Sequence, residues 1–171
     1  MAYRVQDVRC GTILLMERHH PLLSGPGALD TGITVSTVNP FDHSALVVVQ
    51  EGALVIVEAL LHVTVSPLDK YVTDGWAFSV PLTGTQEAAL SHAALSKVGQ
   101  CYGVAMVWQD FLRDDLHVDV HPRLDPYHLD CSGLVVWSFA QAGVVLTHAP
   151  VPSPADLSYS PVPQGIRPWP A

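Results

Sequence analysis

The segment "HSALVVVQEGALVIVEALLHVTV" (residues 43–65) restricts the fold of this chain more than any other stretch. Two runs of mostly Val, Leu, Ile and Ala, apolar at successive positions, flank Glu51-Gly52. Such runs are typical of strands that are buried on both faces of a sheet, and glycine readily adopts the positive φ that a tight turn requires. The segment therefore predicts a strand, a turn at Glu51-Gly52 and a second buried strand.

The turn predicts the register of this hairpin. If Gln50 faces Ala53 across the turn, then Ala45 faces Glu58. His43 and Glu58 become diagonal neighbours on one face, with β-carbons within about 7–8 Å of each other. A three-residue turn would shift this register and separate the two side chains.

His43 and Glu58 are unusual side chains for a buried hairpin. A carboxylate such as Glu58 inside "LVIVEAL" costs free energy unless a partner satisfies it. Taken singly, His43 is more simply a core or strand-edge histidine, and Glu58 a carboxylate bonded to backbone N–H groups. Their occurrence together on one face favours a functional pair.

The segment "HLDCSGLVVWSFAQAG" (residues 128–143) raises the question of a nucleophile. Asp130 is suited to cap a helix and Gly143 to terminate it, which places Cys131 in the first turn. There the helix dipole favours a thiolate. The alternative is a buried structural thiol, because free cysteine is among the most buried residue types.

A cysteine nucleophile needs a base, usually histidine, that a third group holds in place. The sequence thus offers Cys131, His43 and Glu58 as a candidate catalytic set. A metal site formed by His117, Asp119 and His121 in "HVDVH" is a weaker alternative to a solvated loop, because no further ligand is indicated.

Other elements are predicted from pattern alone. Residues 11–17 and 76–82 favour strands, and residues 83–99 favour a helix with capping-box spacing between Thr83 and Gln86. Residues 18–40 are predicted to form a long loop of the kind that often serves as a lid or binding loop.

The C-terminal segment is rich in proline. Seven of the 14 prolines lie within residues 150–170, which predicts neither a helix nor a central strand there but an extended strap or a loose tail.

Composition narrows the class of protein. A chain of 171 residues with 49% hydrophobic residues predicts one globular domain with a real core. A net charge of −8, without a Lys/Arg cluster, argues against nucleic-acid phosphates and anionic membrane surfaces as partners. Only 14% of the residues are charged, which predicts that some surface is covered by a second copy or a larger assembly.

Segments that direct a protein to a membrane or out of the cell are not evident. No run approaches the 18 apolar residues of a membrane span, and the N-terminus does not match a signal peptide. The three scattered cysteines suit a reducing compartment. We therefore expect a protein that is cytoplasmic as synthesised, with release from the cell or association with a virion as alternatives.

Several motifs resemble one family. "DCSGLVVWSFAQAG" closely resembles the nucleophile helix of the NlpC-type cysteine peptidases, papain-like enzymes that cut cell-wall peptides, and "VGQCYG" (residues 98–103) resembles the segment that precedes it. The histidine strand "FDHSALVV" lies upstream of the cysteine, as in the circularly permuted branch of that family. "GTILL" and "SPADL" resemble that branch's first strand and C-terminal segment, whereas Thr12 and Gly133 stand where the permuted branch usually has Asp and Glu.

The resemblance implies a papain-like α+β fold in permuted order, with an antiparallel sheet packed against the cysteine-bearing helix. The domain would span residues 1–157, followed by a Pro-rich tail at 158–171. Cys131 would be the nucleophile, His43 the general base and acid, Glu58 the orienting group, and Tyr102 a hydroxyl near the oxyanion.

The activity implied is hydrolysis of an amide or peptide bond, above all in peptidoglycan, with no cofactor or metal. Two alternatives stay open. One is an acyltransferase or thioesterase acting on lipid or ester acyl groups. The other is a non-catalytic assembly component, for example of a phage tail, with a vestigial site.

Overall fold

The computed structural model describes residues 8–17, 41–71, 75–101, 129–149, 152–161 and 164–168. The strands are β1 (Thr12–Glu17), β2 (Phe41–Gln50), β3 (Ala53–Ala59), β4 (Val63–Ser66), β5 (Gly75–Ser79) and β6 (Gln164–Pro168). The helices are the 3-10 helix η2 (Leu68–Tyr71) and the α-helices α2 (Gly84–Leu95), α4 (Cys131–Gln141) and α5 (Pro154–Ser158). The protein has an α+β fold, and its strands form a six-stranded sheet in the order β4-β3-β2-β1-β5-β6. Every neighbouring pair is antiparallel.

The β2–β3 hairpin has the predicted register. Gln50 pairs with Ala53, and Ala45 pairs with Glu58. Glu51 and Gly52 both have positive φ, 51° and 81°, as expected of a two-residue turn whose twist matches that of the strands. The turn chemistry therefore sets the register on which the proximity of His43 and Glu58 depends.

The predicted second strand of the hairpin is interrupted. β3 ends at Ala59, and the Leu60 N–H bonds the His62 carbonyl at 3.1 Å, which closes a tight turn. The chain then returns as β4, and Glu58 pairs with Thr64. The apolar pattern alone did not reveal this reversal, because both strands share the same β-branched composition.

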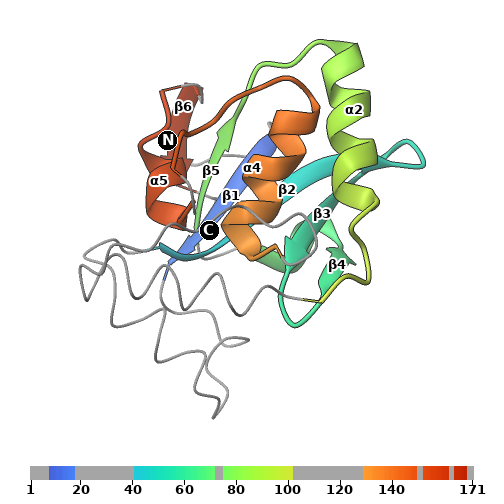
Figure 1. The fold of residues 1–171 in the computed structure, drawn as a ribbon, viewed down its shortest axis with the longest axis horizontal. Helices are drawn as coiled ribbons and strands as arrows, with labels where there is room; N and C mark the ends of the chain where they lie inside the picture. The colour runs from blue at the N-terminus through green and yellow to red at the C-terminus, as the bar shows by residue number, and fades with distance from the viewer. Residues whose placement is uncertain are drawn as a thin grey trace.

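The sheet is buried on both faces, which explains its nearly continuous apolar strands. Helices α2 and α4 lie side by side over one face (Figure 1), and α4 packs on β2, β3 and α2. The core on this side includes Ile13, Leu46, Phe78, Leu134 and Phe139. A second cluster includes Leu14, Val47, Ile56, Tyr71 and Ala77. Within β1 and β2, side chains alternate between the two clusters.

Both predicted helices begin at their predicted caps. Thr83 caps α2 through a complete capping box with Gln86, and Asp130 caps α4. α4 ends as predicted, with Gly143 following at φ 74°. α2 ends at Leu95, four residues before the predicted terminator Gly99, which closes the following turn with φ 87°.

The prediction that residues 150–170 exclude a helix is wrong. α5 begins at Pro154, directly after the N-cap Ser153, where the missing proline N–H costs no intrahelical bond. Residues 164–168 form β6, which pairs with β5 at the edge of the sheet. The sheet thus extends into the segment assigned to the Pro-rich tail, and proline is tolerated there because the strand is an edge strand.

No helix in the described parts of the chain is long and apolar enough to cross a bilayer.

Candidate active site

The sheet brings His43 of β2 against Glu58 of β3. His43 Nε2 lies 3.3 Å from Glu58 Oε2, and the two side chains are 5% and 0% exposed. Their strands are direct neighbours, and the hairpin register makes the two residues diagonal on one face. Because Glu58 engages Nε2, Nδ1 is the ring nitrogen that is left for a second partner.

Glu58 is held by three further side chains from the chain segment that follows β3. Oε1 accepts hydrogen bonds from Ser66 Oγ and from Lys70 Nζ, each at 2.5 Å. Oε2 accepts a short hydrogen bond from the Tyr71 hydroxyl in addition to its contact with His43. Four donors therefore satisfy this buried carboxylate, as its burial requires.

Ser66, Lys70 and Tyr71 were not predicted from the sequence. They lie within "SPLDKY" (residues 66–71), where β4 ends and η2 begins. The signal available was a lysine and a tyrosine close behind a strand pair that contains a lone buried carboxylate. Because the β3–β4 reversal was not recognised, nothing placed these residues next to Glu58.

Cys131 is the first residue of α4 and is 4% exposed. Asp130 caps the helix, with its Oδ1 accepting from the Gly133 N–H at 2.5 Å. The next residue, Ser132, lies with its Oγ 3.1 Å from Ser44 Oγ, so α4 is tied to β2 at positions adjacent to both Cys131 and His43.

The electrostatics of the site favour an ion pair between Cys131 and His43. Burial alone would lower the pKa of His43, but hydrogen bonds with Cys131 and Glu58 and the charges of both groups raise it to about 9. Burial would raise the pKa of the Cys131 thiol, but the hydrogen bond with His43 and its positive charge hold that pKa below its ordinary value. A thiolate beside an imidazolium is the reactive state of a cysteine nucleophile.

Two carboxyl groups next to this pair differ in pKa. Burial acts to raise the pKa of Glu58, but hydrogen bonds from His43, Lys70, Ser66 and Tyr71 lower it to about 2. Burial raises the pKa of Asp130 to about 6 despite the Gly133 N–H bond. Glu58 is therefore an anion at all ordinary pH values, whereas Asp130 changes charge in mildly acidic solution.

The other candidates from the sequence, a hydroxyl near the oxyanion, a binding loop and a metal site, cannot be placed from the described residues. Tyr102, residues 18–40 and the "HVDVH" segment at 117–121 lie outside the described residues. Within the described ranges, no group of three or more His, Cys, Asp or Glu side chains is arranged to hold a metal ion.

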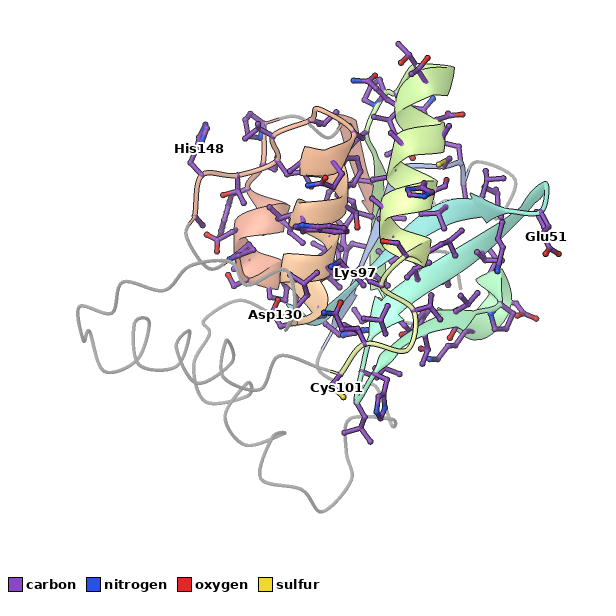
Figure 2. All side chains as sticks on the ribbon, turned by 45° about the vertical axis from the view of Figure 1, so that its right-hand side comes forward. Glu51, Lys97, Cys101, Asp130 and His148 are labelled. Carbon is purple, nitrogen blue, oxygen red and sulfur yellow. The ribbon has the colours of Figure 1, made fainter. Side chains whose placement is uncertain are left out.

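None of the three cysteines forms a disulfide. Cys10 is buried near Ser91 and the Glu87 carbonyl, and burial raises the pKa of its thiol. Cys101 is exposed, and Figure 2 shows it at the end of the chain segment that follows α2.

Two exposed titratable side chains, Glu51 and His148, lie apart from the candidate site. Figure 2 shows Asp130 at the start of α4, with Glu51 at the tip of the β2–β3 hairpin and His148 on a loop well away from both. Glu51 and His148 are exposed, in contrast to buried Asp130. By contrast, Cys131, His43 and Glu58 meet where α4 and β2 begin and β3 ends.

Comparisons with known proteins show similarity at the level of fold. No protein family model matches the chain, and no curated protein matches it with significant sequence similarity. Among solved structures, the metalloprotein YiiX from Escherichia coli O157:H7, a DUF1105 protein, aligns with a TM-score of 0.65 and 16% sequence identity. The alignment covers 95% of this chain and 98% of YiiX, so the two proteins share a fold over nearly their whole lengths.

Proposed function

We propose that this protein is a cysteine hydrolase of the papain-like, circularly permuted NlpC type, which cleaves an amide or peptide bond. The observation that carries the proposal is the row formed by Cys131, His43 and Glu58, with an imidazole between a thiol and a buried carboxylate. Nucleophile, base and orienting group in this arrangement are the requirements of thiol-mediated acyl transfer.

The first half of the reaction forms an acyl-enzyme. The Cys131 thiolate attacks the carbonyl carbon of the amide and forms a C–S bond, while the carbonyl oxygen takes up the negative charge. The N–H groups at the start of α4, with Tyr102 as a proposed second donor, stabilise this oxyanion. His43 then donates its proton from Nδ1 to the leaving nitrogen, the C–N bond breaks and the amine departs.

The second half releases the product. Neutral His43 takes a proton from water, the hydroxide attacks the thioester carbon, and the C–S bond breaks. The carboxylic acid leaves, and the thiolate and imidazolium are restored. Glu58 keeps the ring oriented throughout, because its Oε2 holds Nε2 and its own position is fixed by three other donors.

Peptide bonds of peptidoglycan are the substrate class that the motif resemblance favours. The test is a panel of muropeptides assayed beside simple amides, acyl esters and thioesters. We expect amide cleavage, and we expect the Cys131→Ala variant to lose at least about 10³-fold in kcat/KM. The Cys101→Ser variant, which removes an exposed thiol, is the matched control and keeps its activity.

Two results would redirect the proposal. Turnover of esters or thioesters without any amide would favour an acyltransferase or thioesterase. Absence of turnover on the whole panel, together with an ordinary pKa for the Cys131 thiol, would favour a structural assembly component.

A further inference from the structure

Three side chains from the end of β4 and from η2 contact Glu58 without belonging to the row of Cys131, His43 and Glu58. Lys70 Nζ contacts both Glu58 Oε1 and Ser66 Oγ, at 2.5 and 3.3 Å, and also lies 5.0 Å from the centre of the Tyr71 ring. The Lys70 side chain is only 19% exposed, so its ammonium group faces the buried carboxylate with little solvent between them. Ser66, Lys70 and Tyr71 thus form a clamp on Glu58.

The two oxygens of Glu58 have different partners. Oε1 receives the charged donor Lys70 and the hydroxyl of Ser66, whereas Oε2 receives the neutral Tyr71 hydroxyl and His43. The positive charge therefore neutralises the carboxylate from the side opposite to the imidazole. His43 contacts a carboxylate that belongs to a net neutral pair.

We propose that Lys70 is a positioning residue of the site, which neutralises Glu58 so that this carboxylate orients His43 without over-stabilising its protonated form. The role in catalysis rests on the proposed hydrolase function, because His43 must give its proton to the leaving group. A buried carboxylate without Lys70 would hold that proton more tightly. A lysine without the carboxylate would repel the imidazolium.

The charged and titratable groups around this unit are few among the described residues. Glu58 and Tyr71 face His43 from β3 and η2, with the Tyr71 and His43 ring centres 6.3 Å apart. Cys131 and Asp130 act on it from α4. Lys70 is the lysine among these described groups. Removing its positive charge leaves the negative charge of Glu58 unneutralised, which should favour the protonated form of His43.

A double-mutant cycle on Glu58 and Lys70 tests the proposal. It compares four proteins: the wild type, Glu58→Gln, Lys70→Met and the double variant. The readout is the pKa of the His43 ring, followed by NMR of the imidazole resonance that is absent from His43→Gln. We expect Lys70→Met to raise this pKa by about half a unit or more and Glu58→Gln to lower it. The double variant, neutral again, should return at least halfway from the Glu58→Gln value to the wild type.

Two further variants serve as controls. Lys70→Arg keeps the charge and should keep the pKa of His43 close to the wild-type value. Lys97→Met removes a lysine whose Nζ lies over the Trp137 ring, and it should leave the pKa of His43 unchanged. If Lys70→Met does not fold, the double variant still tests the proposal, because it carries no buried charge at these two positions. The pKa of His43 in the double variant is then compared with its pKa in Glu58→Gln.

The proposal is overturned if Lys70→Met leaves the pKa of His43 unchanged or lowers it, or if the double variant stays at the Glu58→Gln value. A purely structural role of Lys70 would give the latter result, because a second lost contact cannot restore the first. The measurement needs no substrate. The expected pKa pattern without turnover would support the clamp and remove the hydrolase, whereas turnover without this pattern would do the reverse.

Discussion

At the residue scale, the proposed chemistry of the site depends on one imidazole that has two different neighbours. Burial works against a charged His43, so the ring is protonated only because Cys131 and Glu58 both stabilise the cation. The same cation stabilises the Cys131 thiolate. Each charge therefore stabilises the other, and removing either residue makes the charged form of its partner less favourable.

The mutual dependence of Cys131 and His43 predicts a pH profile for alkylation. With iodoacetamide, the Cys131 thiol should react with an inflection below the ordinary cysteine value of about 8.5. In His43→Gln the stabilising cation is gone while burial remains, so the inflection should move above that value. Mass spectrometry of the Cys131 peptide separates this thiol from Cys10 and Cys101. The same inflection in both proteins would contradict the ion pair.

At the element scale, the start of α4 combines a structural cap with the candidate nucleophile. Asp130 accepts the Gly133 N–H and so satisfies one of the free donors of the first turn, directly beside Cys131. Its carboxylate also raises the pKa of Cys131, against the effect of His43. The cap thus stabilises the helix at some cost to thiolate formation.

Substitutions of Asp130 separate these two effects. Asn keeps the cap without the charge, whereas Ala loses both, so Asp130→Asn should be more stable than Asp130→Ala by about 1 kcal/mol in urea unfolding. Equal stability of the two variants at neutral pH would show that the cap contributes nothing.

The pH dependence of Asp130 has a definite sign. Its folded pKa of about 6 lies above the ordinary aspartate value of 3.8, so the folded state binds more protons between these pH values. The contribution of this group to stability therefore falls as pH rises from 3.8 to 6. Asp130→Asn should remove that fall, measured as the free energy of unfolding across this range. An unchanged slope would contradict the raised pKa.

At the scale of the whole molecule, the packing of helix α4 on β2 and β3 brings Cys131 to His43. The Ser44 and Ser132 hydroxyls, both fully buried, lie 3.1 Å apart between β2 and α4. His43 and Cys131 precede them by one residue in their respective elements. This contact therefore joins the two elements directly beside the imidazole and the sulfur.

A double-mutant cycle on Ser44 and Ser132 measures this coupling. Each Ser→Ala change leaves a buried hydroxyl without its partner and should destabilise the fold by about 1–2 kcal/mol, while the double variant should cost less than the sum of the two. Urea unfolding of the four proteins gives the coupling energy. Additive effects would show that the two hydroxyls do not interact.

The sequence determined the features that depend on neighbouring residues. The Glu51-Gly52 turn requires positive φ at two positions and so fixes the hairpin register, which predicts the proximity of His43 and Glu58. The caps at Thr83 and Asp130 are local hydrogen bonds, and both were predicted. Local patterns could be read because the interactions that enforce them span only a few residues.

Only the tertiary structure decided how distant segments meet. The reversal into β4 carries Ser66, Lys70 and Tyr71 to Glu58, and no local pattern distinguishes this reversal from a longer β3. The approach of Cys131 to His43 across 88 residues likewise depends on the packing of α4 against the whole sheet. Side-chain packing between distant elements is a property of the assembled core. For this reason the candidate residues could be predicted from the sequence, whereas the clamp on Glu58 could not.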